Sequence, residues 1–389
     1  MRVSTRSGRG RQTVVRSAVS ASASLNSSTP VVVAGAGIVG ASTAFFLSSE
    51  HDTSVVLIDS THPAASSSGK AGGFLASSWS DGTPTQELAR EGFALHRAWS
   101  EHEFLDVDYR FGIDAVSGML GVPGDYRFIG SDRRGCGQVH PEKLTLALVD
   151  RIVAMGGSVR SSTMLSEVLL EDGGEAGMVG KRVVGVRVET DDGEEVIETR
   201  QCVVALGAWT SLTLKSACNA AYQAMNPEVV GHKVHSIVVK DVRAEGKRES
   251  TSLFLQDGET AADPEAYPRP DGTMYVCGNQ GGRAYDSIPP RLAREVCVEE
   301  DGSAEYLRRV SSVLLETGEV DVRVQQACYL PVSSSNRPVI SKVPGIEGLY
   351  INAGHSCWGI LQGPVSGRAM AELLATGRSS CIDLTPFSL

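Results

Sequence analysis

The chain has 389 residues, enough for two domains, and its 41% hydrophobic and 21% charged residues are ordinary for a globular protein. The formal net charge is -10, and no long basic run follows the N-terminal segment. This argues against nucleic acid or an anionic membrane surface as the main partner. None of the eight cysteines forms a CxxC pair, so neither a metal site nor a redox dithiol is expected.

Residues 1–30 differ in composition from the rest of the chain. They contain arginines at 2, 6, 9, 11 and 16 and many serines, but no Asp, Glu or Lys. This composition predicts a disordered transit segment for an organelle, and the small residues of its later half favour a plastid over a mitochondrion. The alternative is a tail without targeting information, which would leave the protein cytoplasmic.

The next thirty residues predict a strand, a helix and a second strand. Val31–Ala34 is a continuous apolar run, a helical stretch reaches Leu47, and Ser54–Ile58 is a second apolar run that ends at Asp59. Residues 31–47 are uncharged, but they contain three glycines and fall short of the roughly 20 residues that a membrane helix needs. We therefore expect the buried start of a parallel sheet and no transmembrane segment.

The turn between this strand and helix has the spacing GxGxxG, met by Gly35, Gly37 and Gly40. The first glycine permits a tight turn, the second lets a pyrophosphate approach the backbone, and the third allows close packing of helix on strand. The helix N-terminus then binds the phosphates, and Asp59 binds ribose hydroxyls. The sequence therefore predicts a dinucleotide site, against the alternative of a glycine-rich turn without ligand.

Elements further along the chain alternate between helix and strand at both ends, with more strands in the middle. This pattern predicts an α/β fold in which a doubly wound, Rossmann-like FAD/NAD(P)-binding domain is interleaved with a mixed α+β substrate domain. The expected helices are 87–104, 140–155, 303–315 and 362–376; the expected strands include 158–160, 203–207, 236–239, 274–277 and 349–352, with short strands in 107–130 and hairpins in 165–199.

An ordered set of motifs resembles a known family. The fingerprint at 35–40 is followed by the Ser- and Gly-rich loop 66–73, then by the segments 138–141, 203–209 and 354–360. In this order they resemble the superfamily of flavoproteins that includes D-amino-acid oxidase, glycine oxidase and sarcosine oxidase (the DAO superfamily). With Tyr267–Gly272, the chain is most similar to a poorly characterised eukaryotic branch.

The resemblance implies FAD as the cofactor and a division of the chain into interleaved domains. The FAD-binding domain would comprise 31–80, 138–210 and 328–389, and the substrate domain 81–137 and 211–327. The residues implied in FAD binding are Gly35, Ala36, Gly37, Ile38, Val39, Gly40, Asp59, Ser68, Gly69, Lys70, Ala71, Gly72, Gly207, Ala208, Trp209, Gly354, His355, Trp358, Gly359 and Ile360.

One departure from the family concerns its substrate site. The family commonly has an arginine that binds the substrate carboxylate immediately before Pro331, and here that residue is Leu330. Arg337, Arg269 or Arg283 could replace it, but a simple α-amino acid is not the expected substrate. The catalytic residues are not identified by the sequence; His355 and Arg337 are candidates, with a structural role in the glycine turn favoured for His355.

The expected function is oxidation of an amine or amino-acid-like small metabolite by hydride transfer to FAD, which oxygen or another acceptor reoxidises. Cys328 is a candidate for covalent attachment of the flavin, since sarcosine oxidases carry it on a cysteine in the matching strand; the alternative is an ordinary core cysteine. Two other functions stay open: an NAD-dependent dehydrogenase, and a catalytically inactive flavin-binding scaffold.

Overall fold

The computed structural model describes most of the chain after its N-terminal segment. The described residues are 29–101, 105–120, 135–173, 180–241, 251–258, 262–279, 285–286, 288–299, 302–317 and 319–389. The predicted transit segment lies almost wholly outside them and stays a prediction.

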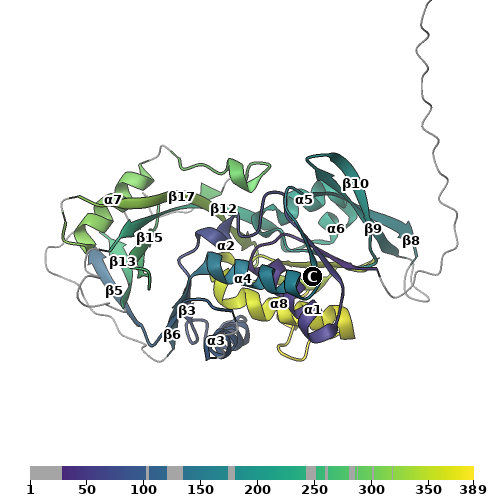
Figure 1. Cartoon of the computed structure of the whole chain (residues 1–389), viewed down its shortest axis with the longest axis horizontal. Helices are drawn as coiled ribbons and strands as arrows, with labels where there is room; N and C mark the ends of the chain where they lie inside the picture. Colours follow the sequence, from purple (N-terminus) through teal and green to yellow (C-terminus); the bar gives the residue numbers. More distant parts are fainter. Residues whose placement is uncertain are drawn as a thin grey trace, which may run out of the picture.

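A six-stranded sheet forms the centre of one half of the molecule (Figure 1). Its order is β18-β20-β11-β1-β2-β7, and all neighbouring strands are parallel except β18 and β20. Segments from both ends of the chain therefore meet in one sheet. The strands are β1 (Val31–Ala34), β2 (Val55–Ile58), β7 (Ser158–Arg160), β11 (Cys202–Val204), β18 (Val339–Lys342) and β20 (Leu349–Ala353).

Both faces of this sheet are buried, because successive side chains of a strand point to opposite faces. Val31 and Val33 belong to one apolar core, and Val32 and Ala34 belong to a second. Four helices build the first core together with the sheet: α1 (Ile38–His51), α3 (Gln86–Glu101), α4 (Pro141–Ala154) and α8 (Gly359–Thr376).

The second face is covered by strands and two short helices. The covering elements are β8 (Met164–Asp172), β9 (Lys181–Thr190), β10 (Gly193–Glu198), β19 (Ile346–Glu347), α5 (Thr210–Ala217) and α6 (Asn219–Ala224). Leu165, Val186 and Leu214 pack there against Ile58 and Val204. The hairpins expected in 165–199 are thus one of the two layers that keep the central strands out of water.

A seven-stranded sheet forms the other half of the molecule, with α7 (Ser303–Leu314) packed on it (Figure 1). Its order is β16-β12-β15-β14-β13-β5, and β17 also pairs with β12. The strands are β5 (Asp114–Leu120), β12 (Val229–Lys240), β13 (Thr251–Asp257), β14 (Glu265–Pro268), β15 (Thr273–Cys277), β16 (Tyr285–Asp286) and β17 (Val322–Ser333).

Smaller elements connect these two halves. The three-stranded sheet β3-β6-β4 comprises β3 (Phe74–Ala76), β4 (Tyr109–Phe111) and β6 (Cys136–Val139), and α2 (Ser67–Lys70) lies against β17. Four 3-10 helices complete the described elements: η1 (Gly207–Trp209), η3 (Ala293–Glu295), η4 (Ser356–Trp358) and η5 (Thr385–Phe387). Within the described ranges, no helix is both long and apolar enough to cross a membrane.

The predicted fold class is confirmed, but two predicted elements differ. The strand expected at 203–207 ends at Val204, and η1 begins at Gly207. The other difference is the last helix. It was expected from residue 362 but begins at Gly359, and Pro364 lies inside it. A proline has no N–H to donate to the carbonyl four residues earlier, which is that of Ile360. His96 of α3 occupies this acceptor, with its Nε2 atom 2.8 Å from the Ile360 oxygen. The buried histidine thereby allows the helix to continue through the proline.

Close packing of α8 against α1 gives the first testable prediction. A Cβ atom on Gly367 would lie 2.5 Å from Ser42 Cβ and 2.6 Å from the backbone nitrogen of Thr43. We expect Gly367→Ala to lower the free energy of unfolding by about 1–3 kcal/mol, because overpacking outweighs the better helix propensity of alanine. Urea unfolding measures the change. Gly258→Ala is the control, since that Cβ would meet only Met119 Cε at 4.0 Å; equal effects would contradict the packing argument.

The second prediction concerns the acid sensitivity of the fold. Burial lowers the pKa of His96 from 6.5 to about 4. The neutral ring therefore stabilises the fold fully above pH 6.5, and this contribution is lost as the pH falls toward 4. Between pH 7 and pH 5 the parent protein should lose about 2 kcal/mol more than His96→Gln in the free energy of unfolding. His62→Gln, which removes an exposed ring, serves as the control. Parallel pH curves for parent and His96→Gln would refute the assignment.

Candidate active site

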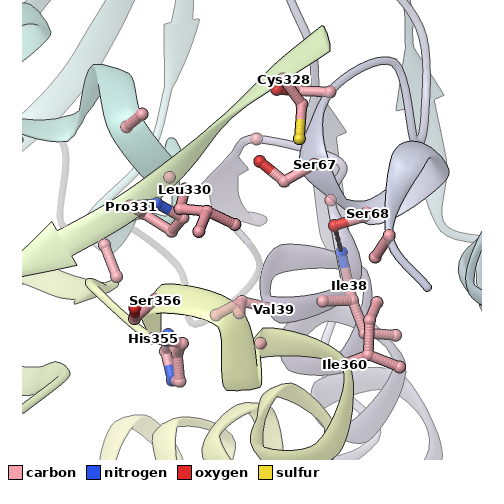
Figure 2. A pocket seen from close by; sticks show the side chains of 18 of the residues that line it. Ile38, Val39, Ser67, Ser68, Cys328, Leu330, Pro331, His355, Ser356 and Ile360 are labelled. Atoms are coloured by element: carbon pink, nitrogen blue, oxygen red, sulfur yellow. Dashed lines mark hydrogen bonds between the residues drawn. The ribbon is translucent and has the colours of Figure 1, made fainter. Parts of the chain in front are cut away.

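A cavity of about 400 Å³ lies at the carboxyl ends of four parallel strands. Ala34, Ile58, Ala205 and Ala353, at or just after the ends of β1, β2, β11 and β20, line it. This edge of an open parallel sheet is where α/β proteins bind their ligands. Figure 2 shows part of the cavity, with β17 on one side and the N-terminal turns of α1 and α8 on the other.

Two glycines of the predicted fingerprint, Gly35 and Gly40, are required by close backbone contacts. Gly35 has a φ of +104°, and a Cβ there would lie 2.3 Å from the carbonyl oxygen of Ala205. A Cβ on Gly40 would lie 1.8 Å from the oxygen of Gly35, whereas Gly37 faces the cavity. The turn therefore brings the backbone at the N-terminus of α1 to the cavity surface, where the partial positive charge of the helix favours an anion.

Asp59 follows β2 and lines the same cavity. Its Oδ2 atom accepts the N–H of Ala36 at 2.9 Å, and Oδ1 accepts the N–H of Thr61 at 2.8 Å. Burial raises the pKa of the Asp59 carboxyl, although these two backbone donors act in the opposite direction. The carboxylate thus supports the glycine turn and still faces the cavity.

The serine-rich loop and α2 are held between α1 and β17. Ser68 Oγ accepts the N–H of Ile38 at 2.9 Å, which Figure 2 shows as a dashed line. Ser67 Oγ donates to the carbonyl of Tyr329 at 2.6 Å, and Lys70 Nζ donates to that of Ala327 at 3.0 Å. These bonds fix the loop across the cavity from the last strand of the second sheet.

The turn before α8 forms the opposite wall, and its histidine is neutral. His355 is buried, with Nε2 2.8 Å from Ser366 Oγ, and burial lowers the pKa of the ring to about 3. Figure 2 shows the ring below the strand that carries Leu330 and Pro331. This geometry fits the favoured interpretation, in which His355 is a structural partner of α8. It does not support His355 as a base that titrates near neutral pH.

Cys328 lies on β17 with its side chain toward the cavity. Figure 2 shows the sulfur pointing to the loop that contains Ser67 and Ser68. Burial raises the pKa of the thiol to about 11, although the Lys70 ammonium and the Ser67 hydroxyl lower it. The Cys328 thiol is therefore protonated near neutral pH, and a protonated thiol is a weak nucleophile.

None of the arginines that could replace a carboxylate clamp lines the cavity within the described residues. Leu330 and Pro331 line it at the family's arginine position. Arg269 donates to the Ala71 carbonyl at 3.2 Å and lies over the ring of Tyr275 at 5.3 Å, and Arg337 is not a cavity residue. Arg283 lies outside the described residues. The side of the cavity near Leu330 is therefore apolar.

Most residues predicted for FAD binding line this one cavity. They are Gly35, Gly37, Ile38, Val39, Asp59, Ser68, Ala71, Gly72, Gly207, Ala208, Trp209, Gly354, His355, Trp358, Gly359 and Ile360. Ala36, Gly40, Gly69 and Lys70 do not line it, but they support residues that do. For example, a Cβ on Gly69 would lie 2.2 Å from the Ala64 oxygen, so this glycine allows the loop to pack.

The sequence analysis missed several cavity residues. Thr163, Met164 and Leu165 line the end near Asp59, while Phe74, Phe254, Glu265, Tyr275 and Cys277 line the end near Trp358. The first group begins a strand in a covering layer, and most of the second lie on strands of other sheets. Their residue types are those of any buried strand, so only the fold brings them together.

Comparisons with known proteins agree with this geometry. A family model described as FAD dependent oxidoreductase (DAO) matches residues 30–115 and 125–373. A Schizosaccharomyces pombe protein named as an oxidoreductase is 28% identical, over 92% of this chain and 98% of its own. Glycine oxidase of Pseudomonas putida is 28% identical over 78% of this chain and 72% of its own.

A solved structure supports the same fold. The crystal structure of glycine oxidase from Geobacillus kaustophilus covers 92% of this chain and 98% of its own, with a TM-score of 0.71 at 19% identity. A match at this identity establishes the architecture, and the family follows from the sequence model. The chain therefore belongs to the DAO family of FAD-dependent oxidoreductases.

Proposed function

We propose that this protein binds FAD in the cavity and oxidises an amine in a small metabolite. The observation that carries the proposal is the convergence of two helix N-termini, those of α1 and α8, on one cavity at the carboxyl edge of the sheet. Neither helix has an acidic residue in its first turn. The α1 terminus suits a pyrophosphate, and the α8 terminus suits the negative charge that a reduced flavin carries.

The cavity also fits FAD in its polar groups. Ser66 Oγ and Asn352 Oδ1 are buried, belong to cavity-lining residues, and have no hydrogen-bond partner among the described residues. Buried polar atoms are normally paired, so these two indicate a ligand that bears donors. At one end of the cavity, the Asp59 carboxylate is placed to accept hydrogen bonds from ribose hydroxyls. Thr163 and Met164 line the cavity beside it, where the adenosine half of FAD would lie.

When bound, FAD would accept a hydride from the carbon next to the amine nitrogen, giving an imine that water hydrolyses, and dioxygen or another acceptor would take up the electrons. The protein would orient the substrate and exclude water from the aromatic end of the cavity. Neutral His355 would hold Ser366 and the turn before α8. No strong base is required for such an oxidation. This agrees with the geometry, which identifies no strong base for this step among the described residues.

The third prediction tests the cofactor and the reaction class. The purified protein should show the visible absorption bands of oxidised flavin, and an amine substrate should bleach them without oxygen. Bleaching by any amine would exclude the inactive scaffold. A colourless protein that also fails to take up added FAD would overturn the proposal and favour a nicotinamide cofactor.

The same preparation tests Cys328. If Cys328 carries the flavin, acid precipitation leaves a coloured pellet in the parent protein and a colourless one in Cys328→Ser. A coloured supernatant from the parent protein would show that the flavin is released and that Cys328 is a core cysteine.

The fourth prediction concerns Asp59. Asp59→Ala removes the acceptor of two backbone N–H groups and the expected ribose contact, so the dissociation constant for FAD should rise about tenfold or more. Titration of apoprotein with FAD, followed by flavin fluorescence, measures it. Asp59→Asn keeps one oxygen as an acceptor, so its dissociation constant for FAD should lie between those of the parent protein and Asp59→Ala. An unchanged affinity in Asp59→Ala would place the ribose elsewhere.

A further inference from the structure

Six aromatic side chains form one continuous wall at the flavin end of the cavity. We call Phe74, Trp79, Phe254, Tyr267, Tyr275 and Trp358 the aromatic wall; all six line the cavity. Trp79 and Phe254 have ring centroids 4.7 Å apart, and Phe74 stacks on Tyr267 at 5.6 Å. Trp79 meets Trp358 at 6.2 Å, which joins the wall to the turn before α8. Whatever reacts at this end of the cavity therefore lies against aromatic rings.

Gly72 shows how closely this wall approaches the predicted flavin loop. A Cβ atom there would lie 2.3 Å from the Tyr267 ring and 3.0 Å from the Tyr275 ring. Loop and wall are thus in direct contact, and both line the cavity. Tyr267, Tyr275 and two further rings of the wall also belong to a hydrophobic cluster around Val238, and they reach the cavity from it.

Glu265 places a carboxylate beside these rings. It lines the cavity, accepts the O–H of Tyr267, and has the Cys277 sulfur 3.8 Å from Oε2. None of the ion pairs formed between described residues involves Glu265, and nearby Asp263 adds a like charge at the cavity. Burial accordingly raises the pKa of the Glu265 carboxyl. A partly buried carboxylate that has no counterion among the described residues is unfavourable, and a cationic ligand would offset its charge.

Positive charge is correspondingly scarce in the cavity. Arg291 is the one basic side chain among the described cavity residues, and it pairs with Glu189 of β9. Glu189 lies opposite Met164, so this pair belongs to the end near Asp59 and away from the aromatic wall. With Leu330 in place of a carboxylate-binding arginine, an anionic substrate would meet Glu265, because the Arg269 guanidinium lies over the Tyr275 ring and does not line the cavity.

We propose that the substrate is a cationic amine without a carboxylate, held with its alkyl-ammonium group between the aromatic wall and Glu265. This inference rests on the proposed function, because the aromatic wall must adjoin the bound flavin. It narrows the substrate class from amines in general to cationic amines without a carboxylate. Aromatic faces attract alkylated ammonium ions, most strongly where water is excluded, and Glu265 supplies a partly buried counter-charge beside these rings. Simple α-amino acids, whose carboxylate would have no partner here, are disfavoured.

The test uses two inert ligands of similar shape and opposite charge, benzyltrimethylammonium and benzoate. Neither can donate a hydride from a C–H next to a free amine, so calorimetric titration of the flavin-loaded protein reports binding alone. We expect the cation to bind at least about tenfold more tightly than the anion. Tighter binding of benzoate would overturn the inference.

Matched variants identify the side chain responsible. Glu265→Gln keeps an oxygen that can accept the Tyr267 O–H, and it should weaken cation binding about tenfold or more. Glu305→Gln removes one exposed negative charge from α7 and should leave the affinity unchanged. Equal affinities in Glu265→Gln and the parent protein would contradict the assignment. A near-UV circular dichroism spectrum confirms that each variant is folded.

A reciprocal variant restores the family's charge. Leu330→Arg places a guanidinium at the cavity wall, so it should gain benzoate binding and lose cation binding. Failure of either change would count against the proposed location of the charged group. Failure of the proposed function looks different: the cation would bind and depend on Glu265, while no amine reduced the flavin. If amino acids reduced the flavin and benzoate bound better, the proposed function would stand and the inference would fall.

Discussion

Close packing of α1 against α8 determines where everything else in the cavity lies. Gly367 lets α8 approach the backbone of Thr43, and a Cβ on Gly363 would lie 3.0 Å from Ile38, in the first turn of α1. Because the two helices touch at these points, both N-termini open on the same cavity. A small residue at each contact therefore sets the spacing between the two positive helix ends, and that spacing limits the size of the ligand between them.

Much of the nucleotide-binding half could be predicted from the sequence, because its signals are local. Val31–Ala34, the glycine spacing and Asp59 lie within thirty residues of one another, and each has a strong physical reason for its position. The last helix was predicted to begin three residues too late, and Pro364 lies inside both the predicted and the observed helix. Its continuation depends on His96, 264 positions away from Ile360, and no local pattern contains that hydrogen bond.

The substrate end could not be predicted in the same way. Phe74 lies far before Phe254 and Tyr267 in the sequence, and each of the three looks like an ordinary strand residue. The sequence did show that Leu330 stands where the family commonly has an arginine, and Leu330 lines the cavity. It could not show which charged residue lies near Leu330's cavity instead, because only the fold brings Glu265 beside the aromatic rings that line it.

The strand order has a consequence for synthesis of the chain. β1 and β2 emerge first from the ribosome, but β11 pairs with β20, which is complete only at Ala353. Six of the seven strands of the second sheet, β12 to β17, are translated between these two partners, and only β5 precedes them. One edge of β11 therefore stays unpaired while more than a hundred further residues are translated. An unpaired apolar strand edge makes a nascent chain prone to aggregate and dependent on chaperones.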